Sequence, residues 1–240
     1  KCESQRVYDT LKREESRKRQ SSIISDDDTD LLLVHNLQKI YGRQKVVKGI
    51  SFGVKPGDCF GLLGVNGAGK TTTFRMLTGD QPLISGEARI CFGNEVVSIS
   101  KETNKYLENV GYCPQFDPIN EVLTGRQMLR LFAELRGISE GVDEEVNMWL
   151  QALGLEEFAD KECGCYSGGN KRKLCIALAL VGGPLLVMLD EPTSGVDPIS
   201  RRKLWDTVNL IQCQTPKPSI ILTSHSMEEC EVLCNKLAIM

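Results

Sequence analysis

The residues with the clearest chemical meaning form a glycine-rich run at positions 64–71, which reads Gly-Val-Asn-Gly-Ala-Gly-Lys-Thr. The run fits the pattern G-x-x-x-x-G-K-[ST] and lies between an apolar stretch and a predicted helix. Its glycines let successive backbone N–H groups point at phosphate oxygens, and the positive end of the helix adds to that field. The lysine of such a loop bridges the β- and γ-phosphates, and the following hydroxyl binds Mg²⁺. The predicted nucleotide-binding residues here are Gly64, Asn66, Gly67, Ala68, Gly69, Lys70, Thr71 and Thr72.

Two carboxylates follow a second apolar run. Residues 185–189 are Leu-Leu-Val-Met-Leu, and Asp190 and Glu191 come directly after them. Ligands of open α/β sheets bind at the carboxyl ends of the strands, so both carboxylates are expected to face the nucleotide. Asp190 suits the Mg²⁺ shell, and Glu191 is expected to polarise the attacking water. A strand that ends in Asp-Glu is common by itself, but together with the glycine-rich loop it indicates a nucleoside triphosphatase.

A Ser-Gly-Gly element narrows the class of triphosphatase. Residues 166–173 read Tyr-Ser-Gly-Gly-Asn-Lys-Arg-Lys, before a predicted helix and upstream of the Asp-Glu strand. Alone this is a flexible turn that caps a basic helix, but with the other motifs in this order the sequence resembles the ATPase domains of ABC transporters. In that family the element presents its serine, glycine N–H groups and a helix N-terminus to the γ-phosphate held by the opposite domain. The resemblance therefore assigns Ser167, Gly168 and Gly169 to a partner's nucleotide.

The same resemblance gives roles to several isolated residues. Tyr41 stands where the family stacks an aromatic ring on adenine; the alternative is a tyrosine of the core. Gln115 matches the glutamine that touches Mg²⁺ or water and joins the core to the helical subdomain, rather than a surface glutamine. His225 stands where a histidine contacts the γ-phosphate, although a lone histidine is more often structural. Residues 194–197 resemble the loop that crosses the dimer interface.

Four segments have sequences similar to those of subfamily A of the ABC transporters, namely 61–67, 111–117, 166–174 and 224–230. Members of that subfamily are large eukaryotic exporters or flippases of phospholipids and sterols. The match is to the second of the two nucleotide-binding domains of that long chain. The resemblance implies ATP and Mg²⁺ as cofactors and a head-to-tail partner in the first nucleotide-binding domain. It also implies attached transmembrane domains, a lipid substrate, no nucleic acid, and a place on the cytosolic face of a membrane.

The elements that must position these residues follow an α/β pattern. Apolar periodicity and turn signals predict strands at 31–35, 46–54, 59–63, 87–92, 110–113, 185–189 and 219–223, and helices at 70–77, 171–181, 201–211 and 227–234. Apolar residues at helical spacing between 125 and 154 indicate a helical subdomain inserted at about 116–182. We expect a P-loop ABC-type ATPase with a RecA-like parallel core sheet, an antiparallel β subdomain and this insertion. The expected domain runs over 31–240, truncated before the closing strands of the family.

The amino-acid composition limits which other classes of protein this chain can belong to. The chain has 240 residues, 41% of them hydrophobic and 25% charged, with a net charge of −3, which is typical of a soluble globular protein and not of a basic nucleic-acid binder. Its apolar runs are far shorter than the roughly 20 residues that cross a bilayer. Two rival functions stay open: a soluble ABC ATPase acting on ribosomes or DNA, disfavoured by the missing basic stripe, and a nucleotide sensor without turnover, disfavoured by Glu191 and His225.

The first 30 residues sort into a basic and an acidic stretch with little to bury, so residues 1–30 are predicted to be a charged flexible linker. A basic run precedes Ser21 and Ser22, which makes either serine a candidate for phosphorylation that the sequence does not decide. Most of the ten cysteines stand singly in apolar runs and are expected to be reduced. With only His35 and His225 in the chain, the cysteine pairs lack the partners of a zinc site, so no structural metal is predicted.

Overall fold

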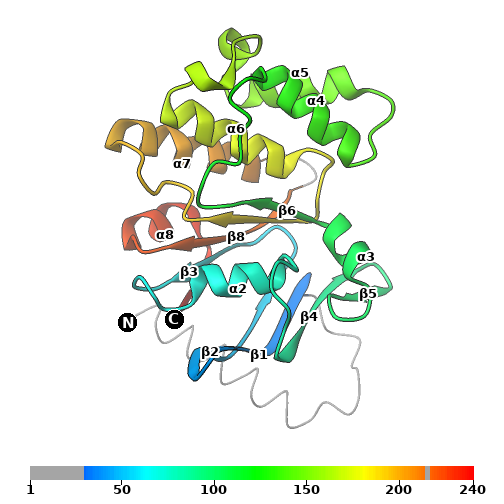
Figure 1. Ribbon diagram of the computed structural model, residues 1–240, viewed down its shortest axis with the longest axis vertical. Coiled ribbons are helices and arrows are strands. Elements are labelled where there is room, and N and C mark those ends of the chain that lie inside the picture. Colours follow the sequence, from blue (N-terminus) through cyan, green and yellow to red (C-terminus); the bar gives the residue numbers. More distant parts are fainter. Residues whose placement is uncertain (1–29, 214–216) are drawn as a thin grey trace.

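The computed structural model describes residues 30–213 and 217–240 (Figure 1). Apart from its last residue, the predicted linker at 1–30, with Ser21 and Ser22, lies outside the described residues. In chain order the elements are β1 (Leu32–Tyr41), β2 (Gln44–Val54), β3 (Cys59–Leu63), α2 (Lys70–Leu77), β4 (Ser85–Phe92), β5 (Glu95–Ser98), α3 (Thr103–Glu108), β6 (Val110–Cys113), α4 (Gly125–Leu135), α5 (Val142–Ala152), η1 (Glu156–Phe158), η2 (Cys163–Cys165), α6 (Gly168–Leu180), β7 (Leu186–Asp190), α7 (Pro198–Gln212), β8 (Ser219–Ser224), α8 (Met227–Leu233) and β9 (Lys236–Ile239).

A parallel sheet with the strand order β6-β7-β8-β3-β9 forms the centre of the molecule. Its central strands β3, β7 and β8 are almost wholly buried because both faces of the sheet are covered. Side chains alternate between two hydrophobic cores: Leu186 and Met188 of β7 join the core of α2, whereas Val187 and Leu189 join the core of α4 to α8. In Figure 1, α6 and α7 accordingly lie on one side of the sheet and α2 lies on the other. The carboxyl ends of β3, β7 and β8 therefore meet at one edge of this sheet.

An antiparallel sheet of order β2-β1-β4-β5 packs beyond α2. Phe74 and Leu77 of α2 are fully buried between Leu32 of β1 and Met188 of the parallel sheet, in one continuous apolar cluster. The helix that begins at the glycine-rich loop is thus held on both sides, which fixes its N-terminus against the ends of the parallel strands.

The helices between 125 and 180 lie at the far end of the molecule from the antiparallel sheet (Figure 1). Thr124 begins α4 with a capping box, in which its side chain accepts the Gln127 N–H and the Gln127 side chain accepts the Thr124 N–H. Helix α6 joins these helices to the sheet, and it approaches β6 so closely that a Cβ at Gly111 would lie 1.8 Å from the Ala179 carbonyl oxygen. The approach requires glycine at that point of the strand.

The predicted fold class is confirmed, because the parallel sheet, the antiparallel sheet and the helices are all present. The sequence reading missed β5, α3 and β9, which are short and only partly apolar. β9 pairs in parallel with β3, from Phe60 opposite Lys236 to Leu63 opposite Ile239. Within the described residues, no helix combines the length and the apolar character needed to span a bilayer.

Candidate active site

The glycine-rich loop connects β3 to α2, and the side chain of its lysine is hydrogen-bonded to carbonyl oxygens of the same loop. Lys70 is the first residue of α2, is only 4% exposed, and donates from Nζ to the carbonyl oxygens of Gly64 at 2.7 Å and Val65 at 3.3 Å. The Gly64 N–H donates to the Ser224 carbonyl oxygen at 3.1 Å, which ties the loop to the end of β8. Gly69 caps the helix with φ +101°, a conformation that favours glycine.

The remaining loop residues face solvent or the helix start. Asn66 and Gly67 are exposed, Gly67 has φ +85°, and Ala68 donates its N–H to the Val65 carbonyl oxygen at 3.1 Å. Thr72 is half-buried in the first turn of α2. The exposed part of the loop therefore leads directly into the N-terminus of α2, and a helix N-terminus is a place where phosphate groups bind.

Asp190 ends β7 and lies beside the loop. Its Oδ1 accepts hydrogen bonds from the hydroxyls of Thr223 and, at 3.4 Å, of Thr71. Its Oδ2 is buried and has no hydrogen-bond partner among the described residues. Burial is the largest influence on this carboxyl and raises its pKa above the usual value. An unpartnered buried carboxylate oxygen next to a threonine hydroxyl is the donor set that Mg²⁺ prefers, so these residues fit the predicted ion.

The Glu191 carboxylate contacts three other predicted site residues. Its Oε1 lies 3.4 Å from Lys70 Nζ, and its Oε2 lies 3.3 Å from Gln115 Nε2 and 3.5 Å from His225 Nδ1. The side chain is 9% exposed, whereas that of His225 is 54% exposed. Three of the predicted residues, which come after β3, β6 and β8, thus surround the predicted base at the end of β7.

Tyr41 ends β1 and is 43% exposed, and Lys39 Nζ lies 5.4 Å from the centre of its ring. An exposed aromatic ring of this kind offers a face for stacking. Ser167 and Gly168 are exposed at the start of α6, where the Ser167 hydroxyl accepts the Asn170 N–H at 3.3 Å. None of the described contacts joins Ser167, Gly168 or Gly169 to the residues around Glu191, so the chain does not bring this element into the cluster.

Three residues with close contacts to the site were missed by sequence reasoning. Thr223 bonds both Asp190 and the Glu191 N–H, Arg172 bonds the carbonyl oxygens on either side of Glu191, and the buried Glu229 accepts the Ser224 hydroxyl at 2.6 Å. Thr223 could have been found as a polar residue at the end of an apolar strand. Arg172 had no such signal, because it stands between Lys171 and Lys173, and only the tertiary packing shows that it is the buried one of the three.

Known proteins resemble this chain over most of its length. The model of the ABC transporter family matches residues 47–194. The retinal-specific phospholipid-transporting ATPase ABCA4 of Homo sapiens is 50% identical over 228 residues, covering 94% of this chain and 10% of that protein. The phospholipid-transporting ATPase ABCA7 of Homo sapiens is 50% identical with the same coverage, and the ATP-binding cassette sub-family A member 2 of Homo sapiens is 49% identical over 92% of this chain and 9% of its own length.

A solved structure, an ATP-binding subunit of an ABC transporter, superposes with a TM-score of 0.75 at 28% identity, covering 88% of this chain and 85% of that one. The chain spans about a tenth of the length of the curated relatives it matches. The family model matches more than half of this chain, and the relatives of subfamily A named above are about 50% identical to it over most of its length; the chain therefore belongs to the ABC transporter family.

Proposed function

We propose that this chain is the ATP-binding and ATP-hydrolysing domain of a membrane transporter that exports or flips phospholipid or sterol. The observation that carries the proposal is the convergence of Lys70, Gln115 and His225 on one carboxylate, within 3.5 Å of Glu191. A nucleotide-binding module without turnover needs the loop but has no need of a buried base with these partners. The lipid substrate is inferred from the names of the relatives, two of which are phospholipid-transporting ATPases.

Each residue has a task in this proposal. The loop N–H groups and Lys70 hold the β- and γ-phosphates, and Tyr41 stacks on adenine. Thr71, Asp190 and Gln115 would hold Mg²⁺, which when bound neutralises charge on the phosphate oxygens. Glu191 takes a proton from the water as it attacks, and His225 contacts the γ-phosphate beside it.

The site is completed by a partner domain in this proposal. Ser167 and Gly168 are exposed, and no described contact joins them or Gly169 to the residues around Glu191, so we assign them to the nucleotide of the first nucleotide-binding domain in a head-to-tail pair. Closing the pair removes water from the γ-phosphate and adds N–H donors to it. The assembly lies on the cytosolic face of its membrane.

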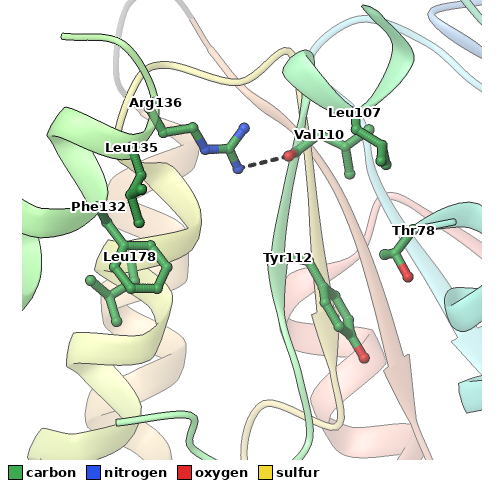
Figure 2. Close-up of a pocket in the computed structure, with 8 residues that line it drawn as sticks. All are labelled: Thr78, Leu107, Val110, Tyr112, Phe132, Leu135, Arg136 and Leu178. Carbon is green, nitrogen blue, oxygen red and sulfur yellow. Dashed lines mark hydrogen bonds between the residues drawn. The ribbon is translucent and has the colours of Figure 1, made fainter. Parts of the chain in front are cut away.

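Contact with the transmembrane domains is expected near residues 115–121, where Phe116 is 82% exposed. A pocket of about 360 Å³ lies at the other end of β6, between that strand and α4. Figure 2 shows Phe132 and Leu135 of α4 on one wall and Tyr112 of β6 on the other. Because this pocket lies apart from residues 115–121, its largely apolar lining adds a second surface to the proposed contact with the transmembrane part.

The test uses the full-length transporter that carries this chain, reconstituted in liposomes with labelled phospholipid. The parent is expected to move label and release phosphate on addition of Mg·ATP, and a Lys70→Met variant is expected to lose both because it no longer holds the phosphates. A Lys173→Gln variant, which changes a lysine on α6 that bonds the Leu153 carbonyl oxygen instead, serves as the matched control. Phosphate release without movement of label would refute the lipid assignment, and no phosphate release by the parent would refute the ATPase assignment.

A further inference from the structure

Arg172 is a buried arginine in the second turn of α6, and all three nitrogens of its guanidinium donate hydrogen bonds. It is 3% exposed. Its Nε donates to the Pro192 carbonyl oxygen at 2.7 Å and its Nη2 to the Asp190 carbonyl oxygen at 2.9 Å. Its Nη1 donates to the Pro114 carbonyl oxygen at 2.6 Å and to Asp117 Oδ1 at 3.1 Å. A buried cation with this many backbone partners holds the chain segments that supply them.

Two of these contacts lie on either side of Glu191. That residue has φ +44°, a left-handed conformation that is costly for any residue with a Cβ. Such a conformation persists only where the surrounding structure holds it. Here the Arg172 fork holds the carbonyl groups before and after Glu191, while Thr223 Oγ1 accepts the Glu191 N–H at 2.9 Å. The backbone of the base is therefore held from both of its sides.

The other arm of the same guanidinium holds the segment that carries Gln115. Nη1 bonds the Pro114 carbonyl oxygen and lies 3.5 Å from that of Gln115. The Gln115 side chain in turn reaches Glu191 Oε2 at 3.3 Å. The Arg172 guanidinium thus fixes the backbone beside both Glu191 and Gln115, whose side chains contact each other.

We propose that Arg172 is a positioning residue for ATP hydrolysis, which keeps Glu191 in its strained conformation and Gln115 beside it. The inference rests on the proposed ATPase function. In it, Arg172 contacts neither the nucleotide nor the attacking water and acts through Glu191 and Gln115. Lysine at this position keeps the charge but places its donors on a single atom, so it does not span carbonyl groups that point from three directions as the guanidinium fork does. Because Arg172 also belongs to the helix that starts with Ser167, the partner-facing element and the base are connected through one side chain.

The test compares Arg172→Lys and Arg172→Gln in the full-length transporter, with Lys173→Gln as the control. Lys173 is the next residue of α6 and also bonds a backbone carbonyl oxygen, that of Leu153 at 2.8 Å, but away from the site. We expect kcat for ATP to fall roughly 10-fold in the lysine variant and roughly 100-fold in the glutamine variant, the range that release of such backbone strain allows. The nucleotide dissociation constant is expected to stay within about twofold, because the loop is untouched, and the control is expected to keep the parental kcat.

Several results would overturn the inference. Parental kcat in both arginine variants, with an active parent, would show that Glu191 needs no such support. A loss of nucleotide binding equal to the loss of kcat, or an equal loss in Lys173→Gln, would mean that Arg172 only stabilises the fold. If the glutamine variant does not fold, the lysine variant decides by the same split between kcat and binding. A parent that releases no phosphate would instead refute the proposed function itself, and this inference with it.

Discussion

Replacing Glu191 by glutamine removes the base while leaving its shape in place. The amide can keep an oxygen at the position of Oε1, 3.4 Å from Lys70 Nζ. Its NH₂ group then lies at the position of Oε2, 3.3 Å from the side-chain nitrogen of Gln115. Rotation of the Gln115 amide turns its oxygen toward that NH₂ group, so two hydrogen bonds survive and the local structure is preserved.

The expected magnitude has two parts. Loss of a general base slows hydrolysis by roughly 10² to 10⁴, about 3 to 5 kcal/mol of transition-state stabilisation. Binding should change in the opposite direction. In the free site the Lys70 ammonium faces the Glu191 carboxylate at 3.4 Å, with a gross attraction of about 5 kcal/mol at an effective dielectric constant of about 20, much of it offset by desolvation. Without that charge the ammonium is free for phosphate, so ATP should bind as tightly as in the parent or more tightly.

The assay is single-turnover phosphate release together with equilibrium nucleotide binding, both on the full-length transporter. Glu228→Gln provides the control, since it removes an exposed carboxylate at the start of α8, close to His225 in sequence. Release at the parental rate would show that Glu191 is not the base. Weaker ATP binding in Glu191→Gln would show that the carboxylate does not compete with phosphate for Lys70.

Four further outcomes are expected. Tyr41→Ala should weaken the free energy of nucleotide binding by about 1 to 2 kcal/mol in calorimetric titration, while Tyr41→Phe keeps the stacking face; equal losses would contradict stacking. Gly111→Ala should lower the midpoint of thermal unfolding by several degrees, because its methyl carbon would meet the Ala179 carbonyl oxygen at 1.8 Å, and an unchanged midpoint would mean that α6 moves aside without cost. Burial raises the pKa of Cys113 to about 11, so at pH 8 iodoacetamide should label exposed Cys165 and spare Cys113 unless the chain is unfolded, as peptide mass spectrometry can check. The isolated chain should bind ATP but hydrolyse it poorly, with specific activity that rises with protein concentration; high activity from a monomer by light scattering would rule out a shared site.

Much of this fold was readable from local pattern. The strand from Cys59 to Leu63, the helix from Lys70 to Leu77 and the strand from Val110 to Cys113 have the predicted bounds, because glycine or proline lies close to their ends. β9 was missed since its four residues have no pattern of their own and become a strand only by pairing with β3. Its conformation is set by the partner rather than by local preference.

Some residues of the candidate site could likewise be assigned from the sequence, and others could not. Lys70, Asp190 and Glu191 could be assigned because a motif fixes their neighbours in sequence. Arg172 and Thr223 act across 18 and 32 residues on Asp190 and Glu191, through contacts that only the packed sheet and helix create. The positive φ of Glu191 likewise has no sequence signal, since Glu-Pro is compatible with several turns. What escapes the sequence is the set of side chains that hold the catalytic ones in place.

The single apolar core on the α6 side of the sheet has a consequence for how the molecule comes apart. It runs without a break from α4 and α5 to α7 and α8, and it contains both tryptophans of the chain. Trp149 donates its indole N–H to Glu145, and Trp205 donates to Glu229, so each ring has a fixed polar neighbour that is lost on unfolding. Their fluorescence signals, separated in Trp149→Phe and Trp205→Phe variants, should report one cooperative transition at one denaturant concentration, although the two rings belong to different helices, α5 and α7.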